Sequence, residues 1–588
     1  MQKTIIAIAL ASIVIACQKE QPKSENEFQK LTETYYEDKN RLNPLEATSN
    51  GESKYHAALE FEMTQAHLDQ VKKIYQSYAT ALTKIDRTSL SEEEKISYGI
   101  MQWETQLALE GLEFPSHYLP ITQFTGTHLT MALYGSGNSA QPFEDVTDYR
   151  NYHRRLERFI KWLEHAKKAM QEGIQAKVTL PKVLTERLIA QFENLVPSRV
   201  EESLFYGALQ QFPASMTDAD KEELSLAYQH TIQHKLNPKL IDFIAFLKND
   251  YLPNSAQADG LSQYPFGQAY YAHLVKQWTT TTATPDEIHA LGLQEVARIR
   301  KEMEKVKTEV GFTGSLHAFF EHVRTKKELM PFTDPQQVLD NFHAIHQRMK
   351  PHVDQYFHLQ PKTPFEIRRT EAFREATASA EYAPGDLKNN RAGVFYVPIP
   401  DVQSYNFYAD ENLFLHEAIP GHHFQIALQQ ENEALPAFRQ KNWFGAAGEG
   451  WALYCESLGK EMGLYTDPYQ YFGMLSSEMH RAIRLVVDTG IHHKGWTREQ
   501  AIAYSLANEA ESESSITAEI ERYMAFPGQA LSYKMGQLKI LELRKKAETE
   551  LGDSFSIKDF HATLLRPGLM PLAMMESLIN EWIAKQKP

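Results

Sequence analysis

Cysteine is almost absent from this chain, which has 2 cysteines in 588 residues. Two thiols cannot build a disulfide framework or a zinc site made of cysteines. A metal bound here must therefore be held by histidine and carboxylate groups, and the chain has 23 histidines to supply them.

Positive charge is also in deficit, since 61 Lys and Arg residues stand against 76 Asp and Glu residues and give a net charge of −15. No stretch gathers Lys and Arg with aromatic residues into a basic face, which argues against a nucleic-acid partner. After the first residues, no run reaches the roughly 18 uninterrupted apolar residues of a membrane-spanning helix. The 42% of hydrophobic residues is typical of a folded globular protein.

The N-terminal residues have the pattern of a lipoprotein signal. A positive start at Lys3 precedes a run of about a dozen mostly apolar residues, which closes on Ala16 and Cys17. A small residue before a cysteine resembles the lipobox of bacterial lipoproteins, whose mature chain begins with a lipidated Cys. We expect a signal peptide at 1–16, a lipidated tether at 17–30, and a periplasmic or outer-membrane location. An ordinary signal peptide with an incidental cysteine is the alternative.

Most of the remaining chain has the apolar spacing of helices. The segments 152–171, 293–310 and 537–551 contain no Gly or Pro and carry apolar residues three or four positions apart. The sequence 284–287 (TPDE) predicts the start of the second helix, because it offers a cap, a proline and two acids, although Gly292 could interrupt that helix.

Strand signal is sparse, and the clearest strand is predicted over 393–397. As an edge beside the active-site cleft it would align a substrate, with Tyr396 as a contact, whereas a structural hairpin is the simpler interpretation. We expect a mostly α, bilobal, metallopeptidase-like body with this small β element. Its N-terminal helical region is expected at 31–275 and its C-terminal catalytic region at 276–588.

The candidate site begins with HEAIPGHH at 416–423. Zinc hydrolases commonly use two imidazoles, a Glu beside the first as a base, and a third ligand. In the usual HExxH motif the histidines lie four residues apart on one helical face. Here the second is His422 or His423, and the break at Pro420-Gly421 would let either swing back. A His-rich turn at a helix junction is the alternative.

A third ligand is available in the segment 449–456 (EGWALYCE). Glu449 and Glu456 are seven residues apart and share a helical face. One could bind the metal while the other accepts a hydrogen bond from a ligand histidine. We favour Glu449 as the ligand, because the glycines on both sides of it let the backbone approach closely. A solvated acidic face is the alternative, but the apolar surroundings make unpaired acids costly.

These segments resemble a known family, the bacterial proteins catalogued as domain of unknown function 885. The family resembles the gluzincin metallopeptidases, whose helical branches place a ligand Glu at about this distance after the HExxH helix. The resemblance implies zinc on His416, His422 and Glu449, with Glu417 as the base. The matching stretches are HEAIPGHHFQ (416–425), EGWALYCE (449–456), RLVVDTGIHHKGW (484–496) and EIERYMAFPGQALSYKMG (519–536).

Further roles follow from the same resemblance. Tyr533 is the candidate for hydrogen bonding to the oxyanion of the tetrahedral intermediate. His492 is a weaker second candidate, for which a buried structural role is the alternative. Arg522 and Arg484 lie in the matching stretches, and a fixed guanidinium can hold a peptide's terminal carboxylate. Structural ion pairs with nearby acids are the alternative for both arginines.

The sequence as a whole predicts a lipid-anchored, extracytoplasmic zinc metallopeptidase that cleaves short peptides. A non-catalytic lipoprotein that binds metal or peptides is the competing interpretation, and it would hold metal without turnover. A carboxylate-bridged di-metal protein would need Glu-x-x-His pairs on two helices, which the segment 416–423 does not supply.

Overall fold

The structure is a computed structural model that describes residues 27–371, 375, 378–387 and 390–587. The predicted signal peptide and the lipidation site Cys17 lie outside these residues. The last part of the predicted tether, residues 27–30, already belongs to the first helix. Within the described ranges, no helix has the length and apolar character needed to cross a membrane.

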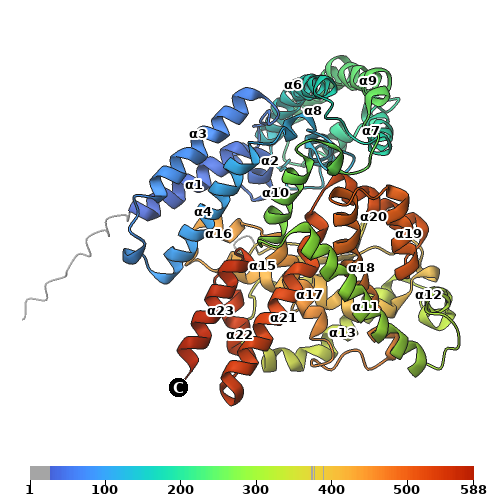
Figure 1. Cartoon of the computed structure of the whole chain (residues 1–588). Helices are drawn as coiled ribbons and strands as arrows, with labels where there is room; N and C mark the ends of the chain where they lie inside the picture. Colours follow the sequence, from blue (N-terminus) through green and yellow to red (C-terminus); the bar gives the residue numbers. More distant parts are fainter. Residues whose placement is uncertain (1–26, 372–374, 376–377, 388–389, 588) are drawn as a thin grey trace, which may run out of the picture.

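Helices dominate the described chain, as the sequence predicts (Figure 1). Those of the N-terminal part are α1 (Glu27–Leu42), α2 (Pro44–Ser49), α3 (Gln65–Leu82), α4 (Glu92–Gly111), α5 (Thr127–Gly135), α6 (Val146–Ala176), α7 (Lys182–Asn194), α8 (Asp218–Thr231), α9 (Asn237–Phe246) and α10 (Gly267–Thr279).

The C-terminal part lies mostly below these helices in the view of Figure 1. Its helices are α11 (Pro285–Glu309), α12 (Leu316–Thr325), α13 (Pro335–Tyr356), α14 (Asp410–Glu417), α15 (His422–Glu431), α16 (Ala437–Lys441), α17 (Gly445–Ser457), α18 (Pro468–His492), α19 (Arg498–Asn508), α20 (Glu513–Ala525), α21 (Ser532–Leu551), α22 (Ile557–Leu565) and α23 (Leu572–Gln586).

The three helices predicted from apolar spacing are present as α6, α11 and α21. The start of α11 is also confirmed, because the Thr284 side chain accepts a hydrogen bond from the Glu287 backbone N–H and Glu287 reaches back in a capping box. The helix runs through Gly292 without a break. A Cβ at Gly292 would lie 2.8 Å from Leu485 Cβ of α18, so this glycine permits close helix packing.

Two large hydrophobic cores hold the helices together. One combines α5–α9 with α11, α12 and α18–α20. The other combines α1, α3 and α4 with α13–α17 and α21–α23. Both cores therefore cross the boundary predicted near residue 275, and that residue itself lies inside α10. The two predicted regions share their cores.

The small β element is a three-stranded sheet in the order β1-β3-β2, made of β1 (Phe365–Arg369), β2 (Glu381–Ala383) and β3 (Gly393–Val397). The predicted strand is β3, which pairs parallel to β1 and antiparallel to β2. Because both of its edges are paired, β3 cannot offer an open edge to a substrate, which corrects that expectation. Tyr396 lies between Arg368 and Glu381 in the sheet register.

Asp410 begins α14, the helix that carries the first motif residues. It is 2% exposed, and its carboxyl group accepts hydrogen bonds from Asn341 Nδ2 at 2.7 Å and Tyr405 Oη at 2.9 Å. Burial raises the pKa of Asp410 to about 8. Since an unfolded Asp has a pKa of about 3.9, the folded state holds the proton more tightly. This residue's contribution to stability is therefore lost as the pH rises from about 4 to about 8.

We expect Asp410→Asn to remove this loss, because an amide fills the same space and does not ionise. Between about pH 5 and about pH 8, the free energy of unfolding of the variant relative to the native protein should improve by on the order of 3 kcal/mol. Denaturant unfolding at both pH values measures the difference. A constant difference between the two proteins would contradict the prediction.

Candidate metal centre

The chain breaks between α14 and α15 and folds back on itself. The connection contains a cis Ile419–Pro420 bond. A Cβ on Gly421 would lie 1.9 Å from the His416 carbonyl oxygen, so only glycine permits this close return. Trp451 Nε1 of α17 donates a hydrogen bond to the Pro420 carbonyl oxygen at 2.8 Å. The break brings the rings of His416 and His422 to a centroid separation of 4.8 Å.

Close packing of α17 against α21 places the acids of α17. A Cβ on Gly450 would lie 2.5 Å from Gly536 Cα, and a Cβ on Gly536 would lie 1.7 Å from the Ala446 carbonyl oxygen. The two helices therefore touch through their backbones. Glu449 precedes Gly450, and Tyr533 lies one turn before Gly536. The backbone contact therefore brings the side chains of Glu449 and Tyr533 close to each other.

His416, His422 and Glu449 converge in space. Glu449 Oε2 lies 3.7 Å from His416 Nε2 and 3.3 Å from His422 Nε2. One potential ligand atom from each residue lies within 4.8 Å of the others. Two ligands of a tetrahedral zinc ion, each about 2.1 Å from the metal, are about 3.4 Å apart. The spacing and the two imidazoles with one carboxylate therefore fit a single zinc ion.

His416 and His422 differ in the contacts of Nδ1, the ring nitrogen that does not face Glu449. His416 Nδ1 donates to Glu456 Oε1 at 2.7 Å, which leaves the Nε2 lone pair free for a metal. Glu456 thus has the outer position that the sequence allowed for one of the two acids. His422 Nδ1 is buried, and within the described part of the chain it has no hydrogen-bond partner.

His423 points away from this cluster. Its Nδ1 lies 3.0 Å from Tyr382 Oη of β2, and its ring centroid is 4.8 Å from that of Phe365. Burial lowers the pKa of His423 to about 4. Of the two histidines that the sequence left open, the structure brings His422 to His416 and Glu449.

Glu417 lies at the end of α14 beside the ligand candidate His416. Burial raises the pKa of Glu417 to about 7; the charge of His422 opposes this shift and the charge of Glu449 adds to it. The charge of Glu381 also contributes, which places the β2 strand close to this carboxyl group. A carboxyl group with a pKa near neutrality can both accept and release a proton.

Tyr533 lies beside Glu449. Burial raises the pKa of Tyr533, and the negative charge of Glu449 raises it further. The guanidinium carbon of Arg484 lies 4.5 Å from the centroid of the Tyr533 ring. The Tyr533 hydroxyl is therefore protonated at neutral pH and able to donate a hydrogen bond.

His492 has no free ring nitrogen for an oxyanion. Its Nδ1 accepts a hydrogen bond from the Leu261 backbone N–H at 3.2 Å, and its Nε2 donates to the Tyr523 carbonyl oxygen at 3.0 Å. The residue is 1% exposed. These contacts conflict with the predicted catalytic role and make His492 a link between backbone segments.

Both candidate arginines form ion pairs with Glu519. Arg522 donates to Glu519 through Nε and Nη2 at 3.0 and 2.8 Å, and to Gln529 Oε1 through Nη1 at 2.8 Å. Arg484 donates to Glu519 Oε2 at 3.0 Å and to Tyr523 Oη at 2.9 Å. The structural alternative from the sequence is therefore present for both. Arg484 Nη1 is buried and has no hydrogen-bond partner among the described residues.

Arg481, one turn before Arg484 on α18, is a charged residue near the site that was not among the predicted site residues. The pKa values of Glu417 and Glu456 are each raised to about 7, mainly by burial. The positive charge of Arg481 opposes both shifts. Arg481 thus supplies positive charge next to the acids of the site. The spacing of two arginines three residues apart on one helix could have revealed this face.

The family described as "Bacterial protein of unknown function (DUF885)" matches residues 44–579. The search of curated proteins gave no match. The chain is similar to "the putative lipoprotein from Colwellia psychrerythraea", with a TM-score of 0.87 and 26% identity over 95% of this chain and 99% of that chain.

A second solved structure shares the fold. It is described as "a putative lipoprotein of unknown function from Shewanella oneidensis", and it matches with a TM-score of 0.73 and 19% identity over 94% of this chain and 100% of that chain. The mostly helical fold with its small sheet is thus common to these proteins. Because the family match spans most of its length, the chain belongs to the DUF885 family of bacterial proteins.

Proposed function

We propose that this protein is a zinc-dependent peptidase that hydrolyses short peptides. The observation that carries the proposal is the convergence of His416, His422 and Glu449, with Glu417 beside them and Glu456 on His416 Nδ1. These three residues would hold a zinc ion, which would supply Lewis-acid polarisation of a carbonyl group and of a water molecule.

The chain's own residues supply the proton transfers and the remaining charge stabilisation. The Glu417 carboxylate takes a proton from the attacking water and passes it to the leaving amine. The Tyr533 hydroxyl donates a hydrogen bond to the oxyanion that develops on the carbonyl. Glu456 accepts a hydrogen bond from His416 Nδ1–H and so fixes the orientation of that ring.

Short peptides are the substrate class that the surroundings favour. The side chains of His422 and Glu449 are only 11% and 14% exposed, so a folded protein could not bring a peptide bond to them. Trp443 is 45% exposed, and its ring centroid lies 5.9 Å from that of His422. It offers a peptide an apolar wall next to the site.

We further propose that the chain is attached to a bacterial membrane through a lipid on Cys17, in the periplasm or at the outer membrane. The apolar run that closes on Ala16 and Cys17 supports this location. The description of the similar Colwellia protein as a lipoprotein supports it as well.

A non-catalytic metal-binding or peptide-binding lipoprotein is the second candidate function. The observation in its favour is that His422 Nδ1 has no hydrogen-bond partner among the residues that the structure describes. A histidine that binds zinc in an enzyme almost always donates a hydrogen bond from its other ring N–H to a neighbour, which fixes the orientation of the ring.

The experiment that separates the two functions is a peptide-library digest with metal analysis. We expect about one zinc per chain. We also expect cleavage that stops after chelation and returns when zinc is added back, as measured by mass spectrometry of the peptide products. Full zinc occupancy without any cleavage would favour the binding protein, and cleavage that survives complete removal of the metal would contradict the peptidase proposal.

A further inference from the structure

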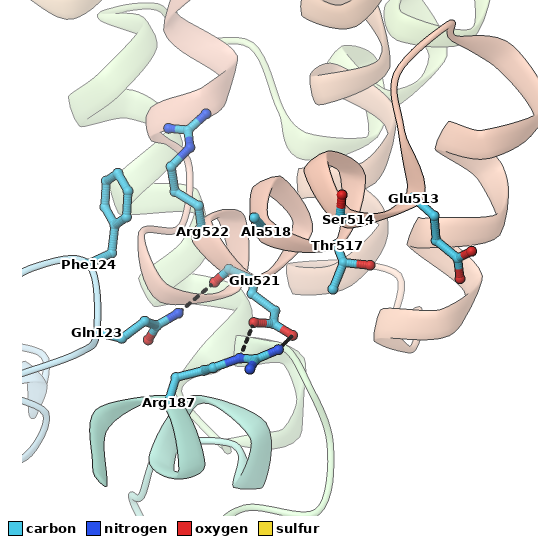
Figure 2. Close-up of a pocket in the computed structure, with 9 residues that line it drawn as sticks. All are labelled: Gln123, Phe124, Arg187, Glu513, Ser514, Thr517, Ala518, Glu521 and Arg522. Atoms are coloured by element: carbon cyan, nitrogen blue, oxygen red, sulfur yellow. Dashed lines mark hydrogen bonds and ion pairs between the residues drawn. The ribbon is translucent and has the colours of Figure 1, made fainter. Parts of the chain in front are cut away.

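An open cavity of about 670 Å³ lies between the N-terminal part of the chain and α20. On one side it is lined by Phe124, from the segment before α5, and by Arg187 of α7. On the other side it is lined by the exposed face of α20, including Thr517 and Ala518 (Figure 2). None of the metal-ligand candidates lines this cavity, which makes it a separate feature of the structure.

The walls are fixed to each other by contacts at Glu521. Its carboxylate lies 2.8 Å from Arg187 Nε and 2.7 Å from Arg498 Nη2. Its carbonyl oxygen accepts a hydrogen bond from Gln123 Nε2 at 3.2 Å, beside Phe124. The cavity is therefore held open by ion pairs and a backbone contact, so a ligand finds it already formed.

The chemistry of the walls favours a flat apolar group. The ring centroid of Phe124 lies 6.3 Å from that of Phe526, and the side chain is still 45% exposed, so much of this large aromatic group remains open to a ligand. The guanidinium carbon of Arg522 lies 5.5 Å from the centroid of the Phe124 ring. Thr517 and Ala518 leave room because their side chains are small. An aromatic or long aliphatic side chain can pack on Phe124 and the arginine plane.

A short chain of contacts joins the cavity to the metal centre. Arg522 lines the cavity and donates through Nη1 to Gln529 Oε1 at 2.8 Å. The Gln529 side chain also hydrogen-bonds to Tyr533, whose hydroxyl is close to Glu449. Arg522, Gln529 and Tyr533 belong to one stretch of chain that runs from α20 into α21, so the cavity and the metal centre are linked through the same part of the molecule.

We propose that this cavity is a distal subsite that binds an aromatic or long aliphatic side chain of the substrate, away from the scissile bond. The proposal rests on the proposed peptidase function. It makes the enzyme selective for peptides long enough to reach both places, with an apolar residue at one defined position.

The test uses the full chain and an alanine-based peptide series in which one phenylalanine moves along the sequence. Hydrolysis is followed with the native protein, and binding is followed by calorimetry with Glu417→Gln. We expect one phenylalanine position to raise both kcat/KM and affinity about tenfold over the all-alanine peptide. Phe124→Ala, which removes the wall, and Ala518→Phe, which fills the cavity, should each abolish that gain.

Leu133→Ala is the matched control, because Leu133 is an exposed apolar residue of α5 that does not line the cavity. It should keep the tenfold gain. Hydrolysis without any positional preference, or a gain that survives both cavity variants, would overturn the subsite while leaving the peptidase function standing. Position-dependent binding without hydrolysis would support the subsite and contradict the peptidase function.

Discussion

Glu417→Gln should keep its zinc and lose peptide hydrolysis by a factor of about 10² or more. The amide has the shape and the hydrogen-bonding reach of the carboxylate, but it cannot take a proton from water. Glu417 is 9% exposed and is not one of the three residues whose ligand atoms converge. Its substitution should therefore disturb the proton transfer and spare the metal. Initial rates together with metal analysis of the purified variant measure both quantities.

A surface substitution of the same chemistry serves as the control. Glu542 of α21 has a side chain that is 59% exposed and pairs with Lys539. Glu542→Gln should hydrolyse peptides at the native rate. If Glu417→Gln also cleaved at the native rate, Glu417 would have no part in the mechanism, and if it lost zinc, its role would be to bind or support the metal.

Loss of zinc is the second large effect that we expect. His416→Ala, His422→Ala and Glu449→Ala each remove one of three protein ligands. Because loss of an outer partner typically weakens metal binding by about 10- to 100-fold, loss of a ligand should cost more than that. Competition with a chelator of known affinity measures the change. Zinc should also raise the melting temperature of the native protein and have little effect on the three variants.

Two further variants sharpen this experiment. His423→Ala should keep native zinc affinity, because His423 Nδ1 contacts Tyr382 and the ring lies against Phe365. Glu456→Gln should fall in the intermediate range of about 10- to 100-fold, because Glu456 contacts His416 only through Nδ1. Zinc loss in the His423 variant with retention in the His422 variant would move the ligand to His423.

Local signals made the helices predictable. The capping box at Thr284 and the apolar spacing of α6 and α21 involve residues only a few positions apart, and the structure has these features where the sequence places them. The position of β3 was predictable for the same reason. Its place in the middle of the sheet was not, because pairing with β1 and β2 depends on segments whose register no local pattern sets.

The candidate site was predictable only as a set of residue types and spacings. HEAIPGHH indicated a broken helix with two converging histidines. Whether the ring of His422 or of His423 comes close to His416 depends on the backbone path at Gly421, which the sequence does not specify. The fate of His492 depends on Leu261, which is 231 residues away in the sequence. Arg481 was not predicted as a site residue, because its charge acts on Glu417 and Glu456, which lie on other helices.

The division of the molecule into two cores has a consequence for how the chain folds. The second core joins α1, α3 and α4 to helices that include α21–α23 at the other end of the sequence. During synthesis α1, α3 and α4 are made long before α21–α23. The apolar side chains that contact those helices therefore stay exposed until the C-terminal part of the chain has been made. Such contacts between distant segments slow folding and leave apolar surface open to aggregation in the meantime. We therefore expect the core around α1, α3 and α4 to be completed only after the C-terminal helices have been made.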